Sequence, residues 1–389
     1  MSISELIEKL ELQMERLINS IPEKLRPYFQ ELDSMFISKA ILLYGPRGTG
    51  KTTYLLLRAR ENNMLYVSGD DIRLLQHPFY DLAEEILKNY SGIIIDEVHG
   101  IKDWGTIIKN MYDSFPNKKI WLSDSSSVLL RKSVADLSRR FVIIKLPLMS
   151  LREYIYFETG KILPKIENVF DQASFDIAKQ ILKEVDAMTY FNKYKEHGTR
   201  PLYIEGNFKE KMMNVVEKTI YYDMLSILEN VSENHYGTMK AIITHLLFSK
   251  IPTITVEKIA KDWGVGKPKF YQLLQTLEDV EMINIVDYTE IKKAYTKGAK
   301  IFLADPTLYY VYEGEVGNFR EAFVVAMLKE KGKILASKDE TKSDFIFNNL
   351  TLEVGGRNKK IKESDYVIRD DVDIPFKNII PLWMLGMMW

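Results

Sequence analysis

The chain has 389 residues, a formal net charge of −1 and no cysteine. The length predicts two or three folded domains, the near-neutral charge leaves any nucleic-acid contact to a local basic patch, and the lack of cysteine excludes disulfides, thiolate metal sites and cysteine nucleophiles. The five histidines show no metal-binding spacing, so we do not expect a metal held by histidine. No stretch reaches the roughly 18 apolar residues of a membrane span and the N-terminus lacks the order of a signal peptide, so we expect a cytoplasmic protein with no membrane partner.

The first part of the chain alternates between predicted helices and strands. Residues 1–33 have helical spacing, and the apolar run Ala40–Tyr44 predicts a buried strand that ends at a glycine and a proline. Further strands are predicted at 64–68, 93–95, 119–123 and 141–146, and helices at 52–60, 81–89, 104–115 and 128–137. This alternation predicts an α/β fold with a parallel sheet covered by helices on both faces.

The remaining chain has a different organisation. Residues 150–230 are mostly helical, with a break at His197–Pro201, and predict a lid or connector. Two helices, 256–263 and 268–280, are predicted around a glycine-containing turn, and the runs 283–287 and 299–303 could form a two-stranded wing. After residue 317 we expect a helix, then three strand-like runs centred on Ile346, Leu352 and Val367, and a buried final strand at 379–389.

A phosphate-binding motif follows the first predicted strand. Gly45 to Thr52 fit the pattern GxxxxGK[ST] between a buried strand and a helix, which is the context this loop requires. Glycines let backbone N–H groups converge on phosphate oxygens, Lys51 reaches the outer phosphates, and Thr52 can ligate Mg²⁺. We therefore predict that ATP is bound by Gly45, Pro46, Arg47, Gly48, Thr49, Gly50, Lys51, Thr52 and Thr53.

Two carboxylates end the apolar strand Ile93–Ile95. We predict that Asp96 contacts Mg²⁺ directly or through water, and that Glu97 orients and deprotonates the attacking water. A pair of solvated acids at a strand end is the alternative. The motif at Gly45–Thr52 favours the catalytic interpretation.

Polar residues also lie at the end of the strand predicted at 119–123 and at the end of the helix predicted at 128–137. Ser123 and Ser125 are candidates to contact the terminal phosphate or the attacking water, and a turn or capping role for the same cluster is the alternative. Arg139 and Arg140 close the following predicted helix. One of them could reach a neighbouring subunit's phosphate as an arginine finger, or both could simply favour a helix C-terminus.

Several of these segments together resemble a known family. They are Ile94–His99, Trp104, Leu122–Ser127, Leu137–Arg140 and Pro147–Glu153. The chain is similar, over nearly its whole length, to prokaryotic AAA-type (AAA_14) P-loop ATPases that carry a DUF4143 C-terminal region. In that pattern Arg140 takes the place of the family's arginine before the last strand.

The resemblance implies a domain order. A P-loop AAA-type ATPase domain is expected at 1–149, a helical lid or connector at 150–240, a winged-helix domain at 241–313 and a restriction-endonuclease-like α/β domain at 314–389. The match to the last domain, which in the family is related to PD-(D/E)xK nucleases, starts at Gly317–Val324, which resembles the family's Gly-x-x-x-Glu-x-x-Val helix.

The resemblance also implies a carboxylate cluster, with Glu321, Asp344 and Glu353 around a divalent cation. Gly355 stands where such sites have a lysine, and Arg357, Lys359 or Lys360 could substitute for it. We therefore expect a degenerate scaffold, with an active nuclease as the alternative.

DNA is a candidate partner through the second helix of the helix-turn-helix. That helix begins with Lys267, Lys269, Tyr271 and Gln272, whose side chains could meet phosphates and bases. Winged helices also serve as plain domain connectors, and the net charge does not favour either reading.

The expected function is magnesium-dependent ATP hydrolysis coupled to a conformational change, acting on DNA or on another protein. A slow nucleotide-dependent switch that binds a protein partner is one alternative, and a metal-dependent nuclease with an ATPase regulator is another. If an arginine acts in trans, the active form is a homo-oligomer.

Overall fold

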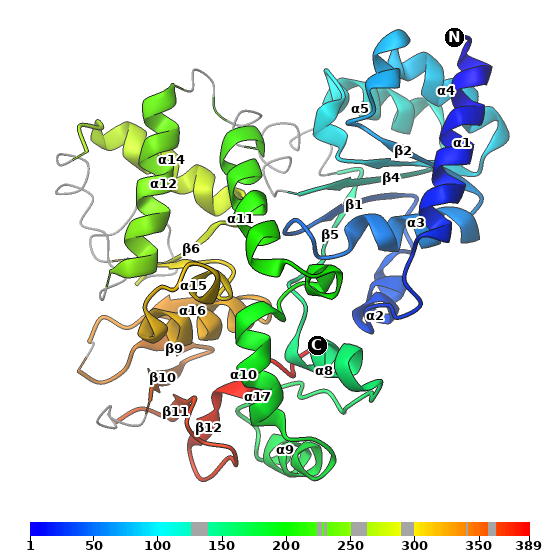
Figure 1. Cartoon of the computed structure of the whole chain (residues 1–389). Coiled ribbons are helices and arrows are strands. Elements are labelled where there is room, and N and C mark those ends of the chain that lie inside the picture. The colour runs from blue at the N-terminus through cyan, green and yellow to red at the C-terminus, as the bar shows by residue number, and fades with distance from the viewer. Residues whose placement is uncertain are drawn as a thin grey trace. The chain divides into compact units, whose positions relative to one another are not determined.

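The computed structural model describes residues 1–125, 139–223, 228, 232–249, 263–288, 299–339, 341–356 and 363–389. The chain divides into two compact units, Met1–Pro147 and Leu148–Trp389 (Figure 1). The helix predicted at 128–137 and nearly all of the one predicted at 256–263 lie outside the described residues.

The first unit contains a five-stranded parallel sheet in the order β2-β3-β4-β1-β5. Its strands are β1 (Ala40–Tyr44), β2 (Met64–Ser68), β3 (Gly92–Asp96), β4 (Lys119–Asp124) and β5 (Val142–Lys145). Its helical elements are α1 (Ile3–Asn19), α2 (Tyr28–Met35), α3 (Lys51–Glu61), η1 (Ile72–Gln76), α4 (Phe79–Asn89), η2 (Val98–Gly100) and α5 (Trp104–Ser114). Each strand overlaps its predicted range, so the predicted parallel sheet is confirmed.

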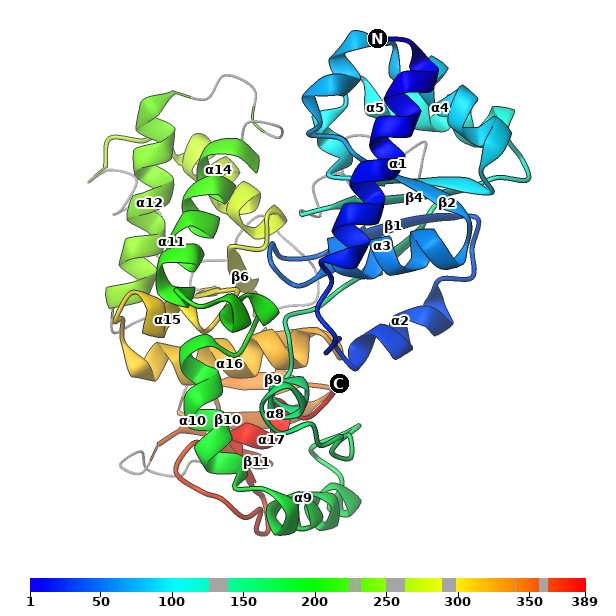
Figure 2. The ribbon, with the colours of Figure 1, turned by 45° about the vertical axis from the view of Figure 1, so that its right-hand side comes forward.

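Helices cover both faces of this sheet, as the alternation of elements predicted (Figure 2). The apolar side chains of α4 and α5 pack on one face, against Ile93 and Ile95, whereas those of α2 and α3 pack on the other, against Ile94. Successive side chains of a strand point to opposite faces, which explains why β3 is apolar at each of these positions.

The N-terminal segment differs from its prediction. A single helical stretch was expected at 1–33, and the structure has α1 and α2 with a break between them. Pro22 and Pro27 lie in and at the end of the break, and proline disfavours a helical conformation in the residue before it. Ser2 begins α1 with a capping box that it forms with Glu5.

The second unit begins with helices, and the strands of its larger sheet lie in the C-terminal part of its sequence. Its helical elements are α8 (Leu151–Thr159), α9 (Gln172–Glu184), α10 (Ala187–His197), η3 (Pro201–Glu205), α11 (Phe208–Lys218), the π-helix η4 (Thr219–Asp223), α12 (Glu233–Phe248), α14 (Lys267–Asp279), α15 (Leu308–Val311), α16 (Val316–Lys329) and α17 (Leu382–Leu385). Its strands are β6 (Ile283–Val286), β7 (Lys300–Leu303), β8 (Ile334–Ala336), β9 (Phe345–Phe347), β10 (Leu350–Gly355), β11 (Tyr366–Arg369) and β12 (Ile379–Pro381).

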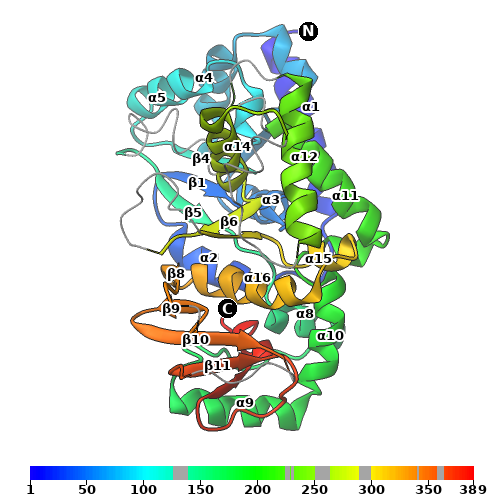
Figure 3. The same cartoon turned by 90° about the vertical axis from the view of Figure 1, so that its left-hand side faces the viewer.

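Two sheets organise the second unit (Figure 3). The strands β6 and β7 form an antiparallel pair, and five strands form a mixed sheet in the order β12-β11-β10-β9-β8. The strands β8, β9 and β10 are antiparallel neighbours, whereas β11 and β12 continue the sheet in parallel with β10. Helix α16 contacts both sheets and is buried along most of its length.

The C-terminal segment is a strand only at its start. A final strand was expected at 379–389, but β12 ends at Pro381 and α17 follows directly. Proline has no N–H to donate to a sheet and is well tolerated at a helix start, which accounts for the change at this residue. The expectation that the segment is buried is confirmed, because Leu382 to Leu385 and Met387 to Trp389 are all buried.

Candidate nucleotide site

The loop between β1 and α3 has a backbone that depends on glycine. Gly45, Gly48 and Gly50 have φ angles of 148°, 77° and 100°, and Gly50 caps the start of α3. A Cβ atom at Gly45 would lie 2.2 Å from the carbonyl oxygen of Leu146, so only glycine fits there. The loop thus directs the N-terminus of α3 toward the space where the motif predicts phosphates.

Lys51 is held inside this loop. Its Nζ donates hydrogen bonds to the carbonyl oxygens of Gly45, at 2.6 Å, and Pro46, at 3.1 Å. Burial lowers the pKa of Lys51, while the carboxylates of Glu97, Asp96 and Asp124 act in the opposite direction. These interactions position the ammonium group at the loop's inner surface.

Arg26 supports the loop from outside the motif. Its side chain is buried, and Nη1 donates to the carbonyl oxygens of Thr49, at 2.9 Å, and Pro147, at 3.0 Å. This tie joins the loop to the segment after β5. No local pattern in the sequence signalled it, because the three residues are far apart along the chain.

Asp96 and Thr52, the pair predicted to hold magnesium, lie together. Thr52 Oγ1 donates to Asp96 Oδ2 at 2.6 Å. Tyr66 donates its hydroxyl to the same oxygen at 2.7 Å, and Ser123 donates to Oδ1. Asp96 is therefore positioned by hydroxyl groups from α3, β2 and β4. Ser123 was a sequence candidate, whereas Tyr66 was missed.

Glu97 directly follows Asp96 and has a left-handed backbone, with φ of 49°. Its Oε1 pairs with Nη1 of Arg47 at 3.1 Å. Burial raises the pKa of Glu97, and Arg47 opposes this rise. A raised pKa makes a carboxylate a better proton acceptor, provided that it is ionised at the working pH.

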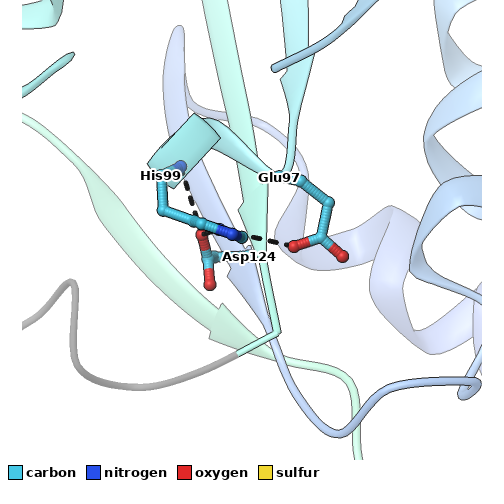
Figure 4. A group of neighbouring side chains, drawn as sticks. All are labelled: Glu97, His99 and Asp124. Carbon is cyan, nitrogen blue, oxygen red and sulfur yellow. Dashed lines mark hydrogen bonds and ion pairs between the residues drawn. The ribbon is translucent and has the colours of Figure 1, made fainter. Parts of the chain in front are cut away.

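His99 and Asp124 join Glu97 in a group that the sequence analysis did not anticipate (Figure 4). His99 Nδ1 lies 2.7 Å from Asp124 Oδ2 and 3.5 Å from Glu97 Oε2. The ligand atoms of the three side chains all lie within 4.8 Å of one another, which makes them a group that could hold a metal ion. The spacing of histidines along the sequence does not reveal such a group, because its other two members are carboxylates, Glu97 directly before η2 and Asp124 at the end of β4.

Ser125 and Arg140 have different positions. Ser125 is buried and follows β4, at the same sheet edge as the loop, since Tyr44 and Asp124 are register partners. Arg140 precedes β5 and so lies at the amino ends of the parallel strands, opposite to the loop at their carboxyl ends. It pairs through Nε and Nη2 with Asp113, both at 3.0 Å. The fold therefore does not bring Arg140 to the phosphate loop of its own chain.

The three carboxylates predicted in the second unit come from three places in the chain. Glu321 lies in α16, Asp344 directly precedes β9, and Glu353 lies in β10. Glu321 pairs with Lys300 at 3.4 Å, and Asp344 Oδ2 accepts a hydrogen bond from the N–H of Val354 at 2.8 Å. Glu353 is buried. Among the residues that the structure describes, Glu97, His99 and Asp124 are the group with metal-binding proximity; Glu321, Asp344 and Glu353 do not form one. The basic candidates at 357, 359 and 360 lie outside those residues.

Residues at the start of α14 lie at the surface. Lys267 and Gln272 are exposed, Lys269 and Tyr271 are partly exposed, and Phe270 is buried. The pair β6–β7 follows this helix in the chain.

Within the described residues, no helix is both long and apolar enough to cross a membrane.

Comparison with models of known families finds one match, which covers less than half of the chain. Residues 38–155 match the family described as an AAA domain. No curated protein matches the chain.

Three solved structures resemble the chain over most of its length. The Walker-type ATPase PABY2304 of Pyrococcus abyssi has 15% identity and a TM-score of 0.41, with 75% of this chain and 97% of that chain covered. The RuvB Holliday junction branch migration motor of Thermotoga maritima has 18% identity and a TM-score of 0.32, covering 81% and 98%. The ORC1 protein of Aeropyrum pernix, solved in complex with DNA, has 13% identity and a TM-score of 0.32, covering 79% and 96%.

Proposed function

We propose that the first unit binds ATP with Mg²⁺ and hydrolyses it to ADP and phosphate. The observation that carries this proposal is the 2.6 Å contact between Thr52, in the first turn of α3, and Asp96, at the end of β3. It joins the end of the glycine loop to the strand that carries Glu97. The AAA domain match at residues 38–155 contains all of these residues and supports the same chemistry.

The residues present fit a magnesium ion. Mg²⁺ prefers oxygen ligands and keeps several waters, so that one or two protein oxygens suffice. Thr52 Oγ1 and a carboxylate oxygen of Asp96 would hold it. When bound, the ion would neutralise charge that develops on the phosphates.

The loop and Lys51 bind the triphosphate. The ammonium group of Lys51 now donates to two carbonyl oxygens, and phosphate oxygens are stronger acceptors because they carry negative charge. Lys51 therefore turns toward the outer phosphates when ATP enters, while the N–H groups at the start of α3 stabilise the same charge.

Glu97 accepts the proton of the attacking water. The water oxygen bonds to the terminal phosphorus, the bond from that phosphorus to the bridging oxygen breaks, and ADP leaves. In the structure described here Glu97 is paired with Arg47, a residue of the phosphate loop. A triphosphate in the loop competes for Arg47 and so releases the carboxylate for this task.

Steady-state hydrolysis of ATP in the presence of Mg²⁺ tests the proposal. We expect Lys51→Ala to weaken nucleotide binding. Glu97→Gln should retain binding and lower turnover by about 100 to 10,000-fold, because a general base contributes this much. Asp81→Asn, a change on α4 outside the site, serves as the matched control and should hydrolyse ATP like the wild type. Equal rates in Glu97→Gln and wild type would rule out the base assignment, and no hydrolysis by the wild type would rule out the enzyme.

DNA is the second candidate partner, favoured by the exposed basic start of α14. Lys267 and Lys269 lie in its first turn, near the surface residue Gln272. Phosphate contacts release counterions, so DNA affinity through this helix should fall steeply with salt. Hydrolysis that is stimulated by DNA in the wild type but not in a Lys267→Ala, Lys269→Ala variant would support this role. If single-stranded, duplex and branched DNA all leave the rate of ATP hydrolysis unchanged, the result favours a switch that binds a protein partner.

Assembly is part of the same proposal. Arg140 lies at the sheet edge opposite the phosphate loop, so its contact with a nucleotide requires a second copy of the chain. The rate of hydrolysis per chain should then rise with protein concentration in the wild type. This rise should be absent in Arg140→Ala.

A further inference from the structure

A cluster of three potential metal ligands lies beside the nucleotide site. Glu97 directly precedes η2, His99 lies within it, and Asp124 is the last residue of β4. In Figure 4 the three side chains point toward a common centre, and the two carboxylates approach His99 Nδ1 from either side. The distances from Nδ1 are 2.7 Å to Asp124 Oδ2 and 3.5 Å to Glu97 Oε2.

These separations suit a shared cation. Zinc-type ions bind histidine nitrogen and carboxylate oxygen at about 2.0–2.2 Å, so neighbouring ligands of one ion lie about 3 to 3.5 Å apart. The observed separations lie near these values, and all three ligand atoms fall within 4.8 Å. Small rotations of the side chains would complete a three-ligand site with further positions open to water.

Glu97 is arranged to supply one oxygen to this centre. Its Oε1 pairs with Arg47, which leaves Oε2 directed toward His99. Oε2 is buried from solvent and, among the described residues, accepts no hydrogen bond. A buried carboxylate oxygen without a hydrogen bond carries a desolvation cost that a bound cation removes.

The charge of the surroundings also favours a cation. The charged side chains around Lys51 include three carboxylates, those of Asp96, Glu97 and Asp124. Lys51 and Arg47 contribute two positive charges. The balance leaves one negative charge when His99 is neutral, which is the form in which imidazole binds metals.

We propose that Glu97, His99 and Asp124 form a binding site for a divalent transition-metal ion of the zinc type. The imidazole nitrogen distinguishes it from the all-oxygen pair of Thr52 and Asp96, because nitrogen ligands favour Zn²⁺ and Co²⁺ over Mg²⁺. The site goes beyond the proposed ATP hydrolysis. One consequence rests on that function: an ion on Glu97 removes the base and inhibits turnover.

Binding is tested first, with the full chain and no nucleotide. Co²⁺ is added and its visible absorption recorded, and Zn²⁺ is then used to displace it in the presence of excess Mg²⁺. We expect one equivalent of Co²⁺ to bind, with affinity at least about 10-fold lower in His99→Gln and in Asp124→Asn. His77→Gln removes an imidazole from the surface of the same unit and is the control that should bind like the wild type.

The outcomes of the binding arm separate the site from general histidine binding. Equal affinity in the wild type, His99→Gln and Asp124→Asn overturns the proposal, as does displacement of Co²⁺ by Mg²⁺ alone. Circular dichroism and the melting temperature of each variant show whether it is folded. If His99→Gln does not fold, Asp124→Asn decides the result.

Inhibition is tested separately, with each variant compared with its own rate without added metal. Zn²⁺ at a fixed concentration of Mg²⁺ and ATP should inhibit the wild type and His77→Gln, and inhibit His99→Gln at least about 10-fold less effectively. Binding of Zn²⁺ without inhibition supports the metal site and contradicts the base role of Glu97. A chain that binds Co²⁺ but never hydrolyses ATP supports the site and refutes the proposed function alone.

Discussion

Asp96 is the residue on which the geometry of the candidate site depends most. Hydroxyl groups of Thr52, Tyr66 and Ser123 donate to its two oxygens, so the carboxylate cannot rotate without losing charge-assisted hydrogen bonds. Each such bond contributes about 1.5–3 kcal/mol. Burial raises the pKa of Tyr66, and the nearby Asp96 raises it further, so that the phenol remains a donor throughout the working pH range.

Tyr66→Phe should weaken the magnesium dependence of the proposed ATP hydrolysis. The change removes one donor to Asp96 and keeps the buried ring, and loss of a hydrogen bond to a metal ligand commonly costs 10 to 100-fold in metal affinity. We expect the Mg²⁺ concentration for half-maximal ATP hydrolysis to rise about 10-fold. Titration of Mg²⁺ at constant ATP measures this.

The matched control is Tyr80→Phe, which removes a hydroxyl that donates to Ser114 on the surface of the same unit. It should leave the magnesium dependence unchanged. An unchanged dependence in Tyr66→Phe would mean that Asp96 is held adequately by Thr52 and Ser123.

At the scale of elements, the phosphate loop depends on the pairing of β1 with β5. The register places Tyr44 beside Lys145, so the chain after β5 passes directly against Gly45. Gly45 combines a positive φ with a Cβ position only 2.2 Å from the backbone of Leu146. Backbone atoms cannot move away as a flexible side chain can.

Gly45→Ala should therefore displace the loop or separate it from the segment after β5. A left-handed backbone costs a non-glycine residue about 1–2 kcal/mol, and the contact with Leu146 adds to this. We expect a lower melting temperature and a loss of ATP binding, measured by thermal unfolding and by calorimetry.

Gly160→Ala is a suitable control because Gly160 also has a positive φ, 75°, but no atom lies within 4 Å of its Cβ position. It should show the backbone cost alone. If the two variants lose the same stability, the close approach to Leu146 is of no consequence.

At the scale of the whole molecule, each unit buries apolar side chains around its own sheet. The first core surrounds the parallel sheet, whereas in the second unit α16 and the mixed sheet bury a set of their own that includes Phe319, Phe323 and Phe345. The residues of the candidate nucleotide site all belong to Met1–Pro147. We therefore expect a ligand of this site to stabilise the first unit directly.

Thermal unfolding with Mg²⁺ and a slowly hydrolysed ATP analogue should show this selectivity. At a ligand concentration 100 times its Kd, the first unit gains about 2.7 kcal/mol, which corresponds to a rise of about 5–10 °C in its transition. Hydrogen exchange read by mass spectrometry assigns each transition to a unit. Lys51→Ala should lose the shift, and one transition that moves as a whole would show that the units unfold together.

The local patterns of the sequence were sufficient for the parallel sheet and for the central motif. The strand–glycine loop–helix unit at 40–61 and the strand that ends in Asp96 and Glu97 are each contiguous, so short-range periodicity and residue type predicted them. The break between α1 and α2 and the helix that ends the chain were missed, because prolines within apolar or helical patterns changed the local outcome.

The contacts around that motif depend on the order of strands in the sheet. Tyr66 and Asp96 are 30 residues apart, His99 and Asp124 are 25 apart, and Arg26 and Pro147 are 121 apart. Local periodicity does not reveal that β3 lies between β2 and β4, and this order brings hydroxyl, imidazole and carboxylate groups to one sheet edge. The sequence alone therefore predicts the glycine loop between β1 and α3 and the two acids that end β3. Folding decides which side chains contact the loop and the acids and brings His99 beside Glu97 and Asp124, because these contacts depend on long-range strand pairing.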